Sequence, residues 1–354
     1  MGVTHLFRSP EAHTTARYFE GVARADPSTE LRVWTGRPAL DEIGPDDLVV
    51  FVDPGPEWPL GLEALACPAV AYFIDVHQNL PIRLDMSRFF DAVFIAQKDY
   101  VPAFEAIGHR HAHWLPLACD PDTHHVPASA RDIDVGFVGK LGLTGTERHA
   151  TLTGVLPRYA TNDYRRFYPP EEMGRLYGRS KIVFNAAING DVNMRVFEAW
   201  AAGALLVTDR VDNGFAEIFE DGVNCVCYAG ADDAIAKIDH FLAHDAEREA
   251  IAGAGQHAAL SRHTYRHRWE AMMAGVRPAM GCAPARGYSR RELGEIYARI
   301  FSATRMPWRI PQAITRYGAS RAAFVELGIA GGRWANSKVP MTPNAFSYKR
   351  RSRR

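Results

Sequence analysis

The sequence predicts an α/β protein made of two units, each with a parallel sheet covered by helices. Short apolar runs rich in β-branched and aromatic residues alternate with segments of 3.6-residue periodicity, and this alternation restarts after a proline-containing segment near residue 120. A chain of 354 residues is long enough for two domains, and 47% hydrophobic with 23% charged residues is the composition of a soluble globular protein. We therefore expect two Rossmann-like domains, at residues 1–127 and 128–275, followed by a third segment at residues 276–354.

The first unit is expected to form strands at apolar runs that are separated by amphipathic segments such as residues 80–90 and 98–108. The runs are LRVWTG (31–36), DLVVFVD (47–53), PAVAYFID (68–75), DAVFIAQ (91–97) and HAHWLPLA (111–118). Residues 115–132 contain three prolines and many polar residues, which is typical of a connection between domains. We interpret the histidines that flank this connection as surface or packing residues: His111, His113, His124 and His125.

The second unit repeats the alternation. Expected strands are IDVGFVG (133–139), KIVFNAAI (181–188), ALLVTD (204–209) and NCVCY (224–228), and expected helices lie at 170–180, 194–202, 232–244 and 245–260. Cys225 and Cys227 alternate within one strand, so we interpret them as buried apolar residues. The five cysteines have neither the spacing of a zinc site nor that of a disulfide framework, and a reducing cytoplasm fits them best.

The last segment is strongly basic. Residues 277–354 contain 16 Lys or Arg and 3 Asp or Glu, so they carry +13, and because the whole chain is neutral, residues 1–276 carry −13. Ser289 and Glu292 have the spacing of a capping box in front of an apolar periodic run, which predicts a helix there. The chain ends with KRRSRR, a sequence that can attract anionic lipid headgroups.

The segment NMRVFEAWAAGALLVTD (193–209) carries the clearest chemistry. Asn193 is a plausible N-cap, and the free amides of residues 194–196 at the positive end of the helix dipole predict an anion site, to which Arg195 adds a full charge. Glu198 follows one turn later and could accept hydrogen bonds from hydroxyl groups of the same ligand. A phosphate beside a sugar hydroxyl is typical of a nucleotide or nucleotide-sugar. The alternative is an ordinary Arg195–Glu198 pair on a solvated helix face.

This segment and the residues after it resemble the C-terminal core of group 1 glycosyltransferases, with the closest match in the spore-maturation CgeB-like branch. Further matches occur in the expected order across residues 70 to 275. They are YFIDVHQN, HWLPLACDPDTHH, DVGFVGKLG with a following Arg, and RLYGRSKIVFN. The resemblance implies the GT-B fold, with two Rossmann-like domains facing a cleft, and a hexosyltransferase-like enzyme that transfers a sugar from a nucleotide-sugar donor.

Donor contacts also follow from the resemblance. Glu198 would bind the ribose hydroxyls, and Arg195 with the amides of Met194 and Val196, which follow Asn193, would hold the diphosphate. Lys140 or Arg148, after Gly139, would neutralise the leaving phosphate. The chain departs from the broader group at Gly190, where a Glu is common, and Asn189, Asp191 or Asn193 could substitute for that Glu.

The acceptor hydroxyl needs a base, which should come from the first domain. Asp75 and His77 lie just after an apolar strand, and Asp53 ends another, although a turn-forming Asp or a surface His would look the same. We expect no metal site, because Asp120-Pro-Asp122 lies in the connection and Asp132-Ile-Asp134 opens a strand. No cofactor is expected beyond the nucleotide-sugar itself.

Two other functions are also compatible with the sequence. One is a sugar-nucleotide epimerase with the same fold, and the other is a non-catalytic binding or scaffold protein that uses its basic tail. Apolar runs long enough to span a bilayer and a signal-peptide pattern are not found in the sequence. We therefore expect a cytoplasmic protein, with possible peripheral contact to an anionic membrane through the tail and with nucleic acid as an unlikely partner.

Overall fold

The computed structural model describes residues 2–9, 14–36, 38–54, 58–126, 130–276, 287–304 and 306–336. Two compact units are present: Met1–Ala96, Tyr100–Trp114 and Met272–Arg354 form unit 1, and Gln97–Asp99 with Leu115–Ala271 form unit 2. The last part of the chain thus belongs to unit 1, as far as it is described. The prediction for the KRRSRR end lies outside the described residues.

Unit 1 contains a six-stranded parallel sheet in the order β2-β1-β3-β4-β5-β6. The strands are β1 (Thr4–Arg8), β2 (Leu31–Thr35), β3 (Leu48–Val52), β4 (Ala69–Phe73), β5 (Ala92–Ile95) and β6 (Ala112–Trp114). The helices that join them are α1 (Thr14–Ala25), α2 (Leu80–Ser87) and α3 (Val101–Ala106). Every residue of β3 and β4 is buried, which explains their continuous apolar sequences.

Strand β1 was missing from the expected strands, although it lies between β2 and β3. The strand begins with two polar residues, Thr4 and His5, which interrupt the apolar pattern expected of a buried strand. Both are nevertheless buried in the folded unit. The His5 ring is satisfied there by two partners, since Trp34 Nε1 donates to its Nδ1 at 2.9 Å and Asp47 Oδ2 lies 3.0 Å from its Nε2. A buried polar group with partners fits a core that the hydropathy pattern alone does not reveal.

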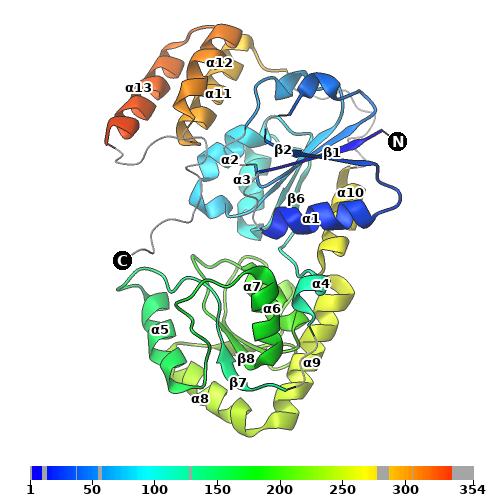
Figure 1. The fold of residues 1–354 in the computed structure, drawn as a ribbon. Coiled ribbons are helices and arrows are strands. Elements are labelled where there is room, and N and C mark those ends of the chain that lie inside the picture. Colours follow the sequence, from blue (N-terminus) through cyan, green and yellow to red (C-terminus); the bar gives the residue numbers. More distant parts are fainter. Residues whose placement is uncertain are drawn as a thin grey trace. The chain divides into compact units, whose positions relative to one another are not determined.

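Unit 2 contains a four-stranded parallel sheet in the order β10-β9-β8-β7. Its strands are β7 (Ile133–Gly136), β8 (Ser180–Asn185), β9 (Leu205–Asp209) and β10 (Val226–Tyr228). Its helices are α4 (Pro121–His124), α5 (Glu147–Val155), α6 (Pro170–Arg179), α7 (Met194–Ala201), α8 (Ala231–Ala243) and α9 (Asp245–Arg262), and α10 (Tyr265–Val276) begins in this unit and ends in unit 1 (Figure 1). The expected strands and helices of this half are therefore confirmed within a few residues.

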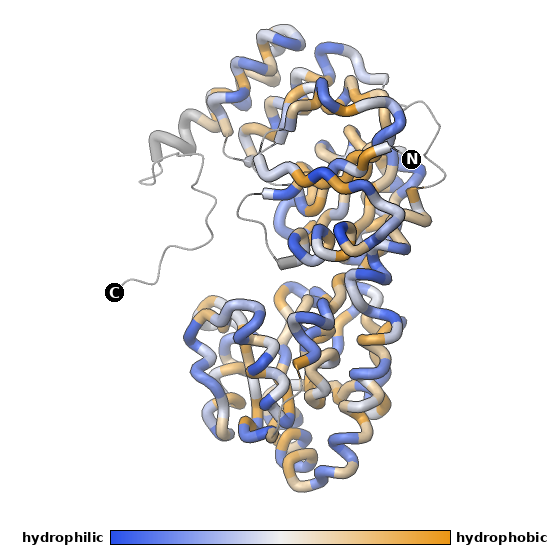
Figure 2. The backbone as a smooth tube through the Cα atoms, turned by 45° about the vertical axis from the view of Figure 1, so that its right-hand side comes forward, coloured by the Kyte–Doolittle hydropathy of each residue, from blue (hydrophilic) through white to orange (hydrophobic). Residues whose placement is uncertain are grey.

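Cysteines 225 and 227 are buried at the end of this sheet, as expected for apolar core residues. In Figure 2 hydrophobic and hydrophilic segments alternate along the chain of both units, as expected for strands and amphipathic helices around a core. None of the helices in the described part of the chain is long and apolar enough to cross a membrane.

The C-terminal helices α11 (Arg290–Ala303), α12 (Ile310–Tyr317) and α13 (Arg321–Asn336) lie side by side in unit 1 (Figure 1). The predicted capping box is confirmed, since Ser289 and Glu292 bond reciprocally at the start of α11. Tyr297 of α11 accepts hydrogen bonds at its Oη from the amides of Gly61 and Leu62. Leu293, Ile296 and other apolar residues of α11 join the same hydrophobic core as β3, β4 and β5, so this helix is an integral part of unit 1.

Candidate functional site

The predicted donor residues of unit 2 gather at the carboxyl ends of its parallel strands. Strands β7, β8, β9 and β10 end at Gly136, Asn185, Asp209 and Tyr228, and parallel pairing brings these ends to one edge of the sheet. Ligands of open α/β sheets bind at this edge. The loop after β8 leads directly into α7, so the N-terminus of this helix belongs to the same edge.

Helix α7 begins as predicted. Asn193 is its N-cap, and its side-chain oxygen accepts a hydrogen bond from the Arg195 amide at 3.1 Å. The Arg195 guanidinium folds back across the strand ends, where Nε donates to the Val138 carbonyl at 2.8 Å and Nη1 donates to Asn185 Oδ1 at 2.5 Å. Its Cζ lies 4.8 Å from the centre of the Phe137 ring. Arg195 is therefore held in one place rather than moving freely on a surface.

Gly139 makes room for this arginine. A Cβ at Gly139 would lie 2.1 Å from Arg195 Nη2, and its φ of +152° is a conformation that favours glycine. The guanidinium thus lies against the loop that follows β7. This contact gives a physical reason for a glycine at the predicted donor position.

A second guanidinium lies against the same ring. Arg148 of α5 has its Cζ 5.7 Å from the centre of Phe137, and its Nη2 donates to the Lys140 carbonyl at 2.6 Å. Burial, together with the nearby charge of Arg195, lowers the pKa of Arg148 to about 10. Because two cations repel each other here, an anion bound between them would be stabilised. The Lys140 side chain is exposed, and its predicted role stays a prediction.

Glu198 is buried rather than solvated. The residue lies on α7, after Arg195, and only 3% of it is exposed. Its Oε1 has no hydrogen-bond partner among the described residues. Burial raises the pKa of Glu198 to about 7, and the Arg195 charge opposes this rise. The interpretation of a solvated Arg195–Glu198 pair is therefore wrong. A buried carboxylate oxygen without a partner is what a site for ligand hydroxyl groups would require.

His124, the last residue of α4, lies next to the Glu198 carboxyl. Its ring is fully buried, and the Asp120 amide donates to its Nδ1 at 3.0 Å. Since burial lowers the pKa of His124 to about 3, the ring is neutral, and its proton must then be on Nε2. This Nε2 lies 3.6 Å from Glu198 Oε1, so the ring directs its donor toward that oxygen without closing a short hydrogen bond.

Several polar residues that support this edge were not among the predicted site residues. Asn162 pairs with the Phe137 backbone through two hydrogen bonds of 2.9 and 2.8 Å, and both Asp209 oxygens accept from the Ala187 amide at 2.9 Å. Asn185 receives hydrogen bonds from Arg195 and Asn193. Each of these residues lies at the last position of a strand or in a loop beside it. For Asn185 and Asp209, this position after an apolar run is visible in the sequence and would predict a place at the site.

The turn before α7 explains the departure from the common Glu. Asn189 and Gly190 have φ of +54° and +69°, the left-handed region in which glycine and asparagine are favoured over glutamate. Asp191 is buried and accepts hydrogen bonds from Gln97 at 3.1 Å and Asn213 at 3.4 Å. Asn193 serves as the cap. Asp191 and Asn193 thus hold the loop in shape, and a donor contact by either stays a prediction.

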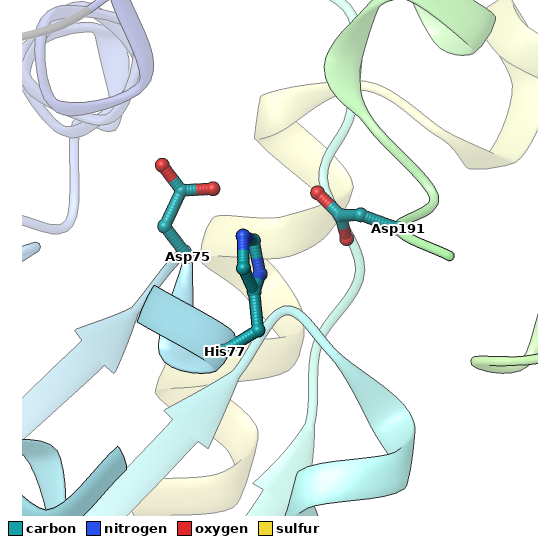
Figure 3. A group of neighbouring side chains, drawn as sticks. All are labelled: Asp75, His77 and Asp191. Carbon is teal, nitrogen blue, oxygen red and sulfur yellow. The ribbon is translucent and has the colours of Figure 1, made fainter. Parts of the chain in front are cut away.

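The candidate bases of unit 1 lie at the carboxyl edge of its own sheet. Asp75 follows β4 with a φ of +51° and accepts from Gln78 Nε2 at 3.0 Å, and His77 lies two residues further on. Figure 3 shows both side chains after that strand. Asp53, after β3, is paired with Arg83 at 2.7 Å, so it is less available as a base than Asp75.

The Asp-x-Asp sequences make structural contacts. Asp120 Oδ2 accepts from Thr123 at 2.5 Å, while Asp132 and Asp134 form ion pairs with Arg179 and Lys181. Before α6, Phe167 is 64% exposed and Tyr168 is buried.

Comparison with known proteins adds a family and a fold. Residues 131–274 match the family described as glycosyl transferase-like. A search of curated protein sequences found no match. The match covers the unit that holds the Arg195–Glu198 segment, but it does not test the CgeB-like branch.

Solved structures of low sequence identity share the fold over most of the chain. Anabaena Alr3699/HepE in complex with UDP-glucose is 13% identical with a TM-score of 0.59, and the match covers 78% of this chain and 100% of that one. A glycosyltransferase from Rickettsia africae is 11% identical with a TM-score of 0.55, covering 79% and 99%. Sucrose-phosphate synthase from Thermosynechococcus elongatus is 10% identical with a TM-score of 0.54, again covering 79% and 99%. Residues 131–274 thus resemble a glycosyl transferase-like family, and most of the chain shares the GT-B fold of these solved structures.

Proposed function

We propose that this enzyme transfers a hexose from a nucleoside diphosphate sugar to an acceptor hydroxyl and binds the donor at the strand ends of unit 2. The observation that carries the proposal is the pair of half-buried guanidinium groups on Phe137 beside the buried Glu198 carboxyl, whose Oε1 has no hydrogen-bond partner among the described residues. Two cations match a diphosphate, and a carboxylate acceptor matches ribose hydroxyls. A structural neighbour was solved with UDP-glucose, which makes a UDP-sugar the first donor to test.

The leaving group determines what the site must do. When the glycosidic bond to the diphosphate breaks, negative charge develops on the phosphate oxygen. Arg195 is already fixed by Val138 and Asn185, so it needs no reorganisation to stabilise that charge. The amides of Met194 and Val196 at the N-terminus of α7 are proposed as further donors, while the Arg195 amide bonds the Asn193 cap. Lys140, in the loop after β7, is proposed to approach the same phosphate through its exposed side chain.

The acceptor hydroxyl is proposed to lose its proton to Asp75 or His77 of unit 1. Both lie at the carboxyl edge of a parallel sheet, and Asp75 adopts a left-handed backbone conformation that is common at functional sites. Asp53 is the weaker candidate because Arg83 neutralises it. The CgeB-like branch and the identity of the acceptor belong to the same proposal.

We also propose that the transfer needs no metal ion. The support is that two arginine side chains lie on Phe137 just after β7, at the carboxyl edge of the unit 2 sheet, whereas three of the four Asp-x-Asp carboxylates are bonded to neighbouring side chains. Fixed cationic groups can replace a divalent ion in stabilising a leaving diphosphate. Activity that persists in excess chelator would support this part, and activity restored only by Mg²⁺ or Mn²⁺ would contradict it.

Calorimetric titration with UDP, GDP, ADP and CDP tests the donor site directly. We expect one nucleotide to bind clearly more tightly than the others, and Arg195→Gln to weaken that binding by about 10- to 100-fold, the loss expected for charge-assisted hydrogen bonds. Arg179→Gln is the matched control, since this exposed arginine of the same unit pairs with Asp132 at the amino ends of the strands, away from the carboxyl edge. Equal affinities for all four nucleotides, or equal effects of the two substitutions, would contradict the proposal.

Turnover then distinguishes a transferase from the alternatives. With the sugar form of the preferred nucleotide, a transferase releases the nucleoside diphosphate faster when the correct acceptor is present. An epimerase would change the donor sugar without an acceptor, and a scaffold protein would do neither. Loss of turnover in Asp75→Asn with unchanged nucleotide affinity would support the proposed base.

A further inference from the structure

We propose that the outer face of α13 inserts into the surface of an anionic lipid membrane. This inference extends the peripheral contact expected from the basic tail, and it does not depend on the donor site. It begins from the distribution of exposed apolar side chains. Of the eight large hydrophobic residues that are exposed in the described part of the chain, four lie between Trp308 and Ile329.

Three of these four side chains lie on one face of α13. The exposed positions of its described side chains are 321, 324, 325, 328 and 329, a spacing of i, i+3, i+4, i+7 and i+8 that follows one side of a helix. Phe324, Val325 and Ile329 on this face are 56%, 52% and 41% exposed. We call these three residues with Arg321 and Gly328 the α13 face.

The opposite side of α13 packs against unit 1. Ala323 and Ala330 are buried, and Leu327 packs against the hydrophobic core of unit 1. Helix α13 is thus anchored on one side and exposes a second apolar stripe on the other. A surface helix of a soluble domain would carry polar residues there, as α12 does with Gln312, Thr315 and Arg316.

The positive charge of this part of the chain favours an anionic lipid surface as the partner of the α13 face. Residues 277–354 carry +13, and the 18 residues that follow α13 contain 6 Lys or Arg and no Asp or Glu. A second copy of this segment would repel an equally basic copy, whereas an anionic lipid surface offers both a hydrophobic interior and opposite charge. Apolar side chains beside basic residues are the pattern of helices that lie in the membrane interface.

The depth of insertion follows from the residues involved. Phe324 and Ile329 would reach the boundary between headgroups and acyl chains, while Arg321 would remain among the lipid phosphates. One apolar face binds a membrane only weakly, and a basic segment alone is likewise weak. The two together give stable but reversible attachment, because their free energies add.

Co-sedimentation of the full chain with vesicles tests the inference. Neutral phosphatidylcholine vesicles are compared with vesicles that contain 30% phosphatidylglycerol, a composition chosen at roughly physiological anionic content. We expect binding to the anionic vesicles only, with a loss of at least about tenfold when salt rises from about 0.1 to 0.5 M. The double substitution Phe324→Ser and Ile329→Ser should reduce the partition coefficient by at least about tenfold.

Val223→Ser is the matched control, because it removes an exposed apolar residue from a loop of unit 2. It should leave vesicle binding unchanged. Nucleotide affinity, measured on every variant, should also be unchanged, which separates failure of this inference from failure of the donor site. Substituting the last five Lys and Arg residues by Gln should weaken binding to anionic vesicles by more than about 100-fold.

Two results would overturn the inference. Equal vesicle binding by wild type and the Phe324→Ser, Ile329→Ser variant would show that the α13 face is not inserted. Absence of vesicle binding, with a dimer in sedimentation velocity that this variant converts to a monomer, would assign the face to a contact between copies of the chain.

Discussion

Replacing Glu198 by Gln should make the ligand-free protein more stable at alkaline pH. The Glu198 carboxyl is buried, and its Oε1 has no hydrogen-bond partner among the described residues. An ionised carboxylate in that position is destabilised, because burial removes water that the charge needs. Gln has nearly the same shape and no charge, so it removes this penalty while it keeps the packing of α7.

The magnitude follows from the pKa. Burial raises the pKa of Glu198 from 4.5 to about 7, and one pH unit corresponds to about 1.4 kcal/mol. Between these two values the folded state holds a proton that the unfolded state has lost, so stability decreases as pH rises through this window. The full penalty, about 3 kcal/mol, is present above pH 7. At pH 5 it should be less than about 1 kcal/mol.

Urea unfolding of both proteins at pH 5 and pH 8.5 measures this difference. We expect the Gln variant to be more stable by about 3 kcal/mol at pH 8.5 and nearly equal at pH 5. Glu220→Gln, which changes an exposed carboxyl of the same unit, is the control and should show no such pH dependence. A difference that is equal at both pH values would refute the argument, because a packing effect does not titrate.

The preferred nucleotide should reverse the order. At 1,000 times its dissociation constant a ligand stabilises the wild type by about 4.1 kcal/mol, which exceeds the penalty of about 3 kcal/mol, and the Gln variant should gain much less because its carboxylate acceptor is gone. Such a reversal would indicate that Glu198 is kept for binding at the expense of stability. Equal nucleotide stabilisation of both proteins would remove Glu198 from the proposed site.

Three further substitutions have defined outcomes. Gly139→Ala should weaken nucleotide binding by about tenfold in calorimetry, because its Cβ would displace Arg195, and unchanged affinity would contradict the contact. Asn193→Ala should cost about 1 kcal/mol in urea unfolding through loss of the α7 cap, while Asn193→Asp should retain most of it. Tyr297→Phe should destabilise unit 1 by about 1 to 3 kcal/mol, since Glu63 and two amides lose a buried partner, and it should leave nucleotide affinity unchanged.

Most of the architecture is predicted by local sequence patterns. Continuous apolar runs rich in β-branched and aromatic residues, such as LVVFV and AVAYF, predict strands that are buried on both faces. The spacing of Asn193, Gly203 and the apolar residues between them predicts α7. The capping box at Ser289 was equally clear. These are local patterns, in which neighbouring residues carry the whole signal. Strand β1 is not predicted from the sequence, because the burial of its His5 side chain depends on hydrogen-bond partners, Trp34 and Asp47, that are distant in the sequence.

The burial and hydrogen bonding of the candidate site follow from the folded arrangement and not from any local pattern. The sequence places Arg195 and Glu198 three residues apart, which fits a solvated ion pair as well as a ligand site. Folding brings Val138 and Asn185 to the guanidinium and His124 to the carboxylate, and it excludes water from the carboxylate. Burial, hydrogen bonding and pKa arise from residues that are far apart in the chain, because parallel strands meet at one edge only after the sheet has formed.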